Sequence, residues 1–109
     1  MTKKISYFYV LYCKDNTLYG GYTTNLERRL NQHNSGTGAK YTRIGSKRPV
    51  KMIYAEKYTT KSEAMKAEYA FKQLTRKQKE AYLIDEDVIF PFDRRRKTII
   101  KDKRVSPNE

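Results

Sequence analysis

Residues 6–23 read SYFYVLYCKDNTLYGGYT and contain the clearest structural pattern in the chain. The segments 6–13 and 18–23 are rich in Tyr, Phe and Val, which favour β-strands. The polar residues 14–17 between them are typical of a hairpin connection. We therefore expect two antiparallel strands. The paired glycines Gly20 and Gly21 mark a bulge, the close approach of another backbone or a ligand, or only a twist point.

The register of this hairpin determines whether Tyr9 and Tyr19 face the same way. Side chains along a strand alternate between the two faces of a sheet. The two tyrosines therefore share a face only if the loop has an odd number of residues or a bulge shifts the count. A two-residue turn at Asp15-Asn16 would separate them, so a shared site requires a three-residue loop, or its equivalent, around residues 15–17.

A first helix is predicted from about Asn25 to Asn34, because residues 24–27 form a capping box that begins at Thr24. Arg29 and His33 are four residues apart and share one face of this helix, beside its apolar stripe. Both are candidate catalytic residues. The structural alternatives are a solvated cation at Arg29 and a partly buried polar side chain at His33, and the helix pattern favours neither reading.

Residues 34–49 are expected to form a loop, because they contain three glycines and a run of hydroxyl side chains. Positions 38–51 hold no acidic residue. Backbone N–H groups and uncompensated cations suit a phosphate backbone, although a basic solvated loop is the simpler alternative. The candidate nucleic-acid-binding residues are Lys40, Arg43, Lys47 and Arg48.

A third strand over residues 50–56 and two further helices complete the pattern. A second capping box, at residues 60–63, opens a helix whose apolar stripe includes Glu68. A carboxylate that points at a core needs a partner, and the candidates are an arginine and a divalent metal ion. The last helix starts at Thr75 and runs to about Ile84.

These elements predict an α+β fold with a small three-stranded antiparallel sheet flanked by helices. At 109 residues the chain has room for a single domain, which we place at residues 5–86. The composition then changes. Residues 87–109 are expected to form a basic, flexible C-terminal tail that adds sequence-independent affinity for polyanions.

Composition limits the class of partner. The chain carries 24 Lys+Arg against 12 Asp+Glu, a formal net charge of +12, which favours nucleic acid. One cysteine, Cys13, and one histidine exclude an intramolecular disulfide and make a cysteine-based zinc site implausible. Residues 1–4 lack an apolar signal region, and no apolar run approaches the ~18 residues of a membrane span. We expect a cytoplasmic protein without membrane contact or a small-molecule cofactor.

Several of these motifs together resemble the GIY-YIG nuclease family, most closely its small stand-alone bacterial YazA/YhbQ type. The similarity extends from residue 7 to about residue 83. Residues 7–9 match the first signature element, with Tyr7 in place of its opening glycine, and residues 19–21 match the second. Further similarity lies at residues 23–30, His33, 34–42, 67–69 and 72–75. The resemblance implies a GIY-YIG-like arrangement of the predicted sheet and helices.

The resemblance also implies phosphodiester hydrolysis with one divalent ion, Mg²⁺ or Mn²⁺. In that chemistry Glu68 holds the metal, Arg29 binds the scissile phosphate and Tyr9 holds the hydrogen-bond network. The general base is left open between Tyr19 and His33. A free tyrosine, with a pKa of ~10, needs help from nearby cations or metal-linked water, whereas histidine, at ~6.5, faces no such barrier.

The sequence as a whole therefore favours a metal-dependent DNA endonuclease, with DNA repair or processing and branched or damaged DNA as candidate settings. The chief alternative is a noncatalytic nucleic-acid-binding module on the same scaffold. A third is a basic adaptor for an acidic protein or ribosomal surface. Glu68 discriminates among them, because phosphate binding alone gains nothing from a carboxylate.

Overall fold

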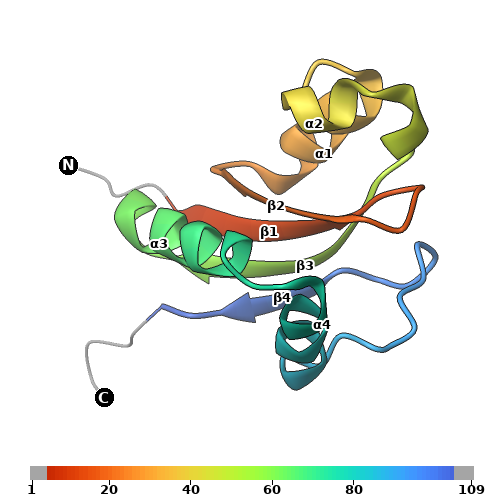
Figure 1. Cartoon of the computed structure of the whole chain (residues 1–109). Helices are drawn as coiled ribbons and strands as arrows, with labels where there is room; N and C mark the ends of the chain where they lie inside the picture. The colour runs from red at the N-terminus through yellow and green to blue at the C-terminus, as the bar shows by residue number, and fades with distance from the viewer. Residues whose placement is uncertain (1–4, 105–109) are drawn as a thin grey trace.

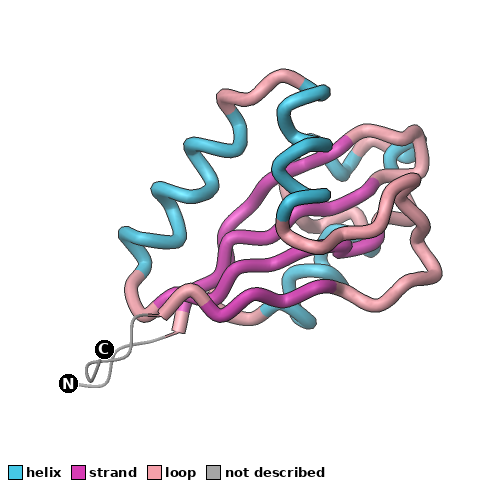
Figure 2. Tube along the Cα trace, turned by 90° about the horizontal axis from the view of Figure 1, so that it is seen from below, coloured by secondary structure: helices cyan, strands magenta, loops and turns pink. Residues whose placement is uncertain are grey.

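A computed structural model describes residues 5–104, which form one sheet with helices on both faces (Figures 1 and 2). The elements in chain order are β1 (Ser6–Tyr12), β2 (Leu18–Thr23), α1 (Leu26–Ser35), α2 (Lys40–Arg43), η1 (Gly45–Lys47), β3 (Lys51–Tyr58), α3 (Lys61–Lys72), α4 (Arg76–Asp85) and β4 (Ile99–Asp102). Residues 1–4, where the sequence has no apolar signal region, lie outside the described part.

The sheet has four strands in the order β2-β1-β3-β4. Strand β1 is antiparallel to both β2 and β3, as the hairpin pattern predicts. Strand β4 runs parallel to β3. The prediction of an α+β fold with flanking helices is therefore confirmed, whereas the prediction of a three-stranded, purely antiparallel sheet is wrong.

The fourth strand comes from the segment that we expected to be a flexible tail. Ile99 packs against the core, and the Thr98 hydroxyl donates to the Met52 carbonyl oxygen at 2.6 Å. Near the start of the same segment, Val88 is also buried. These apolar contacts hold residues 88–102 against the domain despite the surrounding arginines and lysines. Residues 105–109 of the expected tail lie outside the described part.

The hairpin loop has the odd length that a shared tyrosine face requires. The last pair of the β1–β2 ladder is Tyr12 with Leu18. The Cys13 N–H then donates to the Thr17 carbonyl oxygen at 2.9 Å, which leaves three residues, 14–16, in the turn. Asn16 adopts a positive φ of 70°, a conformation that asparagine tolerates better than most residues.

The two faces of the sheet carry separate cores. On one face, β1 residues Phe8 and Val10 pack with Phe71 of α3 and Leu83 of α4. On the other face, Tyr9, Leu11 and Cys13 form a second cluster, against which Leu26 and Leu30 of α1 pack. Figure 1 shows α1 and α2 together on one side of the sheet, away from α3 and α4. The alternation of side chains along β1 thus supplies both layers.

The segment expected to be a loop is more regular than its composition indicates. It folds into the short helical turns α2 and η1. The side chain of Asn34 closes its base, because it accepts from the Val50 N–H at 2.7 Å and donates to the Val50 carbonyl oxygen at 3.1 Å. Gly36 caps α1 and Gly45 is the first residue of η1, so these glycines belong to helical elements rather than to one open loop.

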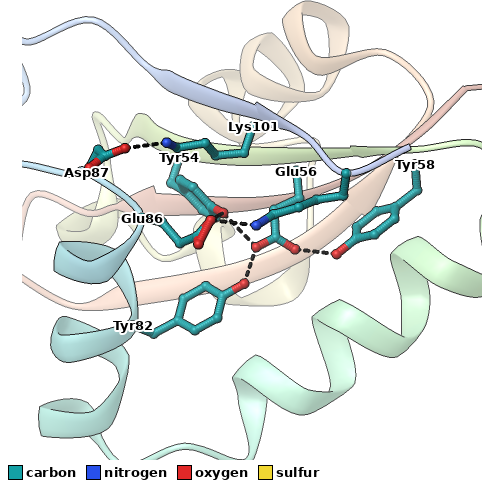
Figure 3. A network of polar contacts seen from close by, with 8 residues as sticks. Tyr54, Glu56, Tyr58, Tyr82, Glu86, Asp87 and Lys101 are labelled. Atoms are coloured by element: carbon teal, nitrogen blue, oxygen red, sulfur yellow. Dashed lines mark hydrogen bonds and ion pairs between the residues drawn. The ribbon is translucent and has the colours of Figure 1, made fainter. Parts of the chain in front are cut away.

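A buried carboxylate lies on the α4 side of β3 (Figure 3). Glu56 is only 1% exposed. The hydroxyls of Tyr54 and Tyr58 each donate to it at 2.6 Å, and the Tyr82 hydroxyl donates to it as well. Burial and the neighbouring Glu56 carboxylate raise the pKa of all three phenols, so they remain donors. Hydrogen bonds from three tyrosines offset the cost of burying this charge.

We expect a chain that ends at Glu86 to be less stable than the full chain. The truncation removes Val88 and Ile99 from the core, which costs about 3 kcal/mol or more, and should lower the melting temperature by about 10–20 °C. Thermal unfolding followed by circular dichroism measures this change. A chain that ends at Arg104 is the matched control and should melt close to the full chain. Equal melting of the two truncations would contradict a structural role for residues 87–104.

Candidate active site

Tyr9 and Tyr19 lie on the same face of the β1–β2 hairpin. In the ladder Tyr9 is opposite Gly21, and Tyr19 is opposite Leu11. Tyr9 and Leu11 belong to the core cluster on the α1 side of the sheet, and the partly buried Tyr19 packs against that cluster. The expected shared face is therefore present, and the odd loop of the hairpin is its cause.

Gly21 provides the space that Tyr9 occupies. The β1–β2 ladder continues without a bulge across both glycines, so the bulge considered for them is absent there. A Cβ atom at position 21 would overlap the hydroxyl of Tyr9. The close approach at this glycine is thus made by the Tyr9 side chain of the neighbouring strand β1. This side chain crosses β2 towards α1.

Helix α1 brings Arg29 and His33 to this phenol. The helix begins after Asn25, whose side chain accepts from the Arg28 N–H at 3.0 Å, so Asn25 rather than Thr24 is the N-cap. His33 is fully buried, and its Nε2 lies 2.7 Å from the Tyr9 hydroxyl. The Arg29 Nε–H donates to the same hydroxyl at 3.3 Å. Both candidates from this helix therefore meet Tyr9 directly.

Thr42 fixes the direction of these hydrogen bonds. Its hydroxyl lies 2.7 Å from His33 Nδ1 and donates to the Ala39 carbonyl oxygen at 3.1 Å. Since a hydroxyl has one proton, Thr42 accepts from an Nδ1–H, and the neutral ring then presents Nε2 as an acceptor. The Tyr9 hydroxyl donates to that nitrogen. A directed chain therefore runs from Arg29 through Tyr9 and His33 to Thr42.

Burial sets the protonation states along this chain. Desolvation, with a smaller contribution from the charge of Arg29, lowers the pKa of His33 to about 4. Desolvation also raises the pKa of Tyr9 to about 12, although Arg29 opposes this shift. At neutral pH the imidazole is therefore uncharged and the Tyr9 phenol keeps its proton, which agrees with the hydrogen-bond directions above.

Tyr19 differs from Tyr9 in its access to solvent. Its side chain is half-buried, whereas Tyr9 is fully buried. The Tyr19 ring stands edge-on to the His33 ring, with centroids 5.5 Å apart. Among the two tyrosines and the histidine, Tyr19 is thus the group that a solvent molecule can reach.

Glu68 reaches the same region from α3. Its negative charge is close enough to contribute to the raised pKa of Tyr9. The expected arginine partner is replaced by a lysine, because Lys72 Nζ lies 3.5 Å from Glu68 Oε2. The Glu68 side chain is 19% exposed, so it lies at the edge of the core rather than inside it.

Glu68 could hold a divalent ion as a single protein ligand. No group of three or more His, Cys, Asp or Glu side chains that could enclose a metal occurs within residues 5–104. Mg²⁺ commonly binds through one or two carboxylates, with water and substrate phosphate completing its shell. One half-buried carboxylate within electrostatic reach of the Tyr9 phenol fits that mode of binding, and it does not fit a metal site closed by the protein alone.

The predicted nucleic-acid-binding cations lie in different surroundings. Lys47 forms an ion pair with Asp15 at 2.6 Å and lowers the pKa of that carboxyl to about 2. Arg48 is half-buried, and its Nη2 donates to the Arg43 carbonyl oxygen at 3.3 Å. The Arg43 side chain is exposed. The side chain of Lys40 lies outside the described part. Arg43 is therefore the described member of this set that is most accessible to a ligand.

Sequence reasoning missed two residues at this site, Thr42 and Lys72. Thr42 lies within the matched residues 34–42, but one hydroxyl among several in that segment gives no sign of its role before the fold places it beside His33. Lys72 did have a signal. It follows Glu68 by four residues on a helix, a spacing that brings opposite charges together.

Comparison with known proteins places the chain in a family. Residues 5–81 match the GIY-YIG catalytic domain, and the chain belongs to the GIY-YIG family. GIY-YIG nucleases generally use divalent metal ions, and the family implies a DNA substrate. The hairpin, α1 and the Glu68 helix described above all lie within the matched residues.

Relatives and a solved structure agree with this assignment. A UPF0213 protein of Enterococcus faecalis is 69% identical over 81 residues, which cover 74% of this chain and 92% of the relative. The UPF0213 protein YazA of Bacillus subtilis is 57% identical over 77 residues, covering 71% and 76%. The solution structure of protein EF2693 from E. faecalis matches with a TM-score of 0.55 and 61% identity, covering 84% of this chain and 96% of that one.

Across residues 5–104, no helix has the length and apolar character that a bilayer crossing requires.

We expect the buried His33 to make stability depend on pH between about 6.5 and 4. Its pKa is about 4 in the folded state against the ordinary histidine value of 6.5, so in this window the unfolded chain binds a proton that the folded chain does not. Stability is then full above pH 6.5 and falls as pH decreases, by on the order of 3 kcal/mol at pH 4. His33→Gln should remove this part of the dependence.

The chain has one histidine, so an NMR titration of its ring nitrogens gives the pKa without assignment ambiguity, and urea unfolding at several pH values gives the stability. A measured pKa near 6.5 in the folded protein would contradict a buried, neutral His33.

Proposed function

We propose that the protein is a metal-dependent DNA endonuclease that hydrolyses phosphodiester bonds with the Tyr9, Tyr19, Arg29, His33 and Glu68 side chains. The observation that carries the proposal is the hydrogen-bonded chain from Arg29 through Tyr9 to His33, next to Tyr19 and within electrostatic reach of Glu68. These groups come from β1, β2, α1 and α3. Their meeting at one place supports catalysis more strongly than any one of them alone.

Arg29 is assigned to the scissile phosphate. Its Nε–H is used by Tyr9 and one Nη1–H by Gln32, at 3.3 and 3.1 Å, which orients the half-buried guanidinium. A guanidinium has five N–H donors in a planar fork that suits phosphate oxygens. Tyr9 then acts as a positioning residue, since its hydroxyl accepts from Arg29 while its own proton is held by His33.

Tyr19 is the better candidate for the group that takes a proton from the attacking water. His33 is fully buried, and both of its ring nitrogens are occupied by Tyr9 and Thr42, so water has no route to it. Tyr19 is half-buried and accessible. These observations support Tyr19, rather than His33, as the proposed base.

Glu68 is the residue that would hold a divalent ion, Mg²⁺ or Mn²⁺. When bound, such an ion neutralises charge on the phosphoryl oxygens and on the departing oxygen. The Glu68 carboxylate would hold the ion close to Tyr9, whose pKa its charge helps to raise. A module that only binds nucleic acid would gain nothing from a carboxylate there, because it repels phosphate. Glu68 therefore favours a nuclease over a noncatalytic binding module.

Glu68→Gln should abolish metal-dependent cleavage, lowering the rate by about 100-fold or more, and should leave DNA affinity equal or slightly higher because one negative charge is lost. Nicking of supercoiled plasmid with Mn²⁺ measures the rate, and fluorescence anisotropy measures the affinity. Glu63→Gln, an exposed substitution on the same helix, is the matched control and should cut normally. Indistinguishable rates for Glu68→Gln and wild type would favour the binding module.

Arg29→Ala should lower the cleavage rate much more than the affinity for DNA. The guanidinium is assigned to charge that develops in the transition state, so its loss should cost about 100-fold in rate and only a few-fold in binding. Arg28→Ala removes the same charge from an exposed position one residue away and serves as the control. If both substitutions changed rate and affinity in equal proportion, Arg29 would contribute general attraction only.

A further inference from the structure

Lys72 contacts two of the proposed catalytic side chains. It lies in the last turn of α3, with its Nζ 3.5 Å from Glu68 Oε2 and 5.4 Å from the centroid of the Tyr19 ring. The ammonium group is therefore placed beside both the carboxylate that would hold a metal and the phenol that would face the attacking water.

The ion pair between Lys72 and Glu68 is weak enough to be exchanged. The Lys72 side chain is 45% exposed, and exposed ion pairs contribute only about 0–1 kcal/mol. The distance of 3.5 Å between Lys72 Nζ and Glu68 Oε2 is also longer than the roughly 2.7–2.9 Å of a direct charge-assisted hydrogen bond. Little free energy thus holds the ammonium on Glu68, and a stronger anion nearby could take it.

This ion pair has a consequence for metal binding. Glu68 would act as a single protein ligand, since residues 5–104 contain no cluster of metal-ligating side chains. The Lys72 ammonium would therefore compete with a divalent ion for the Glu68 carboxylate. A substrate phosphate offers Lys72 another anion, and its flexible four-carbon stem allows the ammonium to follow.

We propose that Lys72 exchanges partners, pairing with Glu68 in the free protein and with a substrate phosphate in the complex, so that metal and nucleic acid bind cooperatively. The inference rests on the proposed nuclease function and adds a regulatory property to the same site. Free protein then holds metal weakly, and the full charge of Glu68 becomes available when DNA has bound. Coupling between two ligands is reciprocal. Mn²⁺ must therefore strengthen DNA binding by the same factor by which DNA strengthens Mn²⁺ binding.

The test is a comparison of Mn²⁺ dissociation constants for wild type and Lys72→Gln, each with and without DNA. Electron paramagnetic resonance of unbound Mn²⁺ gives the constants, and a short duplex with phosphorothioate linkages slows cutting during the measurement. Without DNA, Lys72→Gln should bind Mn²⁺ about 3–5-fold more tightly than wild type, since it lacks the competing ammonium. With saturating DNA the two proteins should agree within about twofold, because Lys72 has left Glu68.

Two further variants sharpen the comparison. Lys66→Gln removes the same charge from an exposed position on the same helix and should leave Mn²⁺ affinity unchanged in both conditions. Lys72→Arg keeps a cation at the same spacing and should retain the weaker binding of wild type. A lysine that stayed beside Glu68 and merely repelled cations would give Lys72→Gln the same advantage with and without DNA, and that result would overturn the exchange.

The experiment also separates this inference from the proposed function. If wild type cuts plasmid with Mn²⁺ while Lys72→Gln and wild type bind Mn²⁺ equally in the free state, the nuclease assignment stands and the exchange is refuted. If wild type neither binds Mn²⁺ with DNA present nor cuts, both are refuted.

Discussion

The two successive glycines of β2 are the constraint on which this molecule depends. Adjacent residues of a strand face opposite sides of the sheet. On one side a Cβ at Gly20 would lie 3.1 Å from Phe71 Cδ2 of α3, and on the other a Cβ at Gly21 would overlap the Tyr9 hydroxyl. Because neither glycine has a side chain, α3 approaches β2 from one side of the sheet and the Tyr9 side chain approaches it from the other, at neighbouring positions. Tyr9 crosses to α1, and α3 carries Glu68 to the same place.

The contrast between two carboxylates shows how the fold separates stability from chemistry. Glu56 is buried and accepts hydrogen bonds from three phenolic hydroxyls, one of which belongs to Tyr82 and links β3 to α4. Glu68 is partly exposed, with a loose ion pair to Lys72. Only the second carboxylate can change its partner at low cost, and it is the one that lies near Tyr9 and Tyr19.

Much of the fold could be predicted from local sequence, because hairpins and helix caps depend on neighbouring residues. The N-caps Thr60 and Thr75 are confirmed, and the hairpin loop has the odd length that a shared tyrosine face requires. Strand β4 could not be predicted, because four residues within a basic segment pair with β3 more than forty residues earlier. Thr42 was missed for a related reason, since its role depends on the position of α2 beneath His33. Local charge and composition carry no information about such distant contacts.

The positive charge of the chain has two separate roles, long-range attraction of a polyanion and direct contact with a phosphate. Each ion pair, such as that of Lys47 with Asp15, cancels one charge of each sign and leaves the net charge of +12 unchanged. Long-range attraction of a polyanion follows net charge and its distribution, so it does not require every lysine and arginine to be free. Direct contact with a scissile phosphate has a stricter requirement. It needs a cation beside the tyrosines, and Arg29 and Lys72 meet that requirement from opposite sides of the β-sheet, one from α1 and the other from α3.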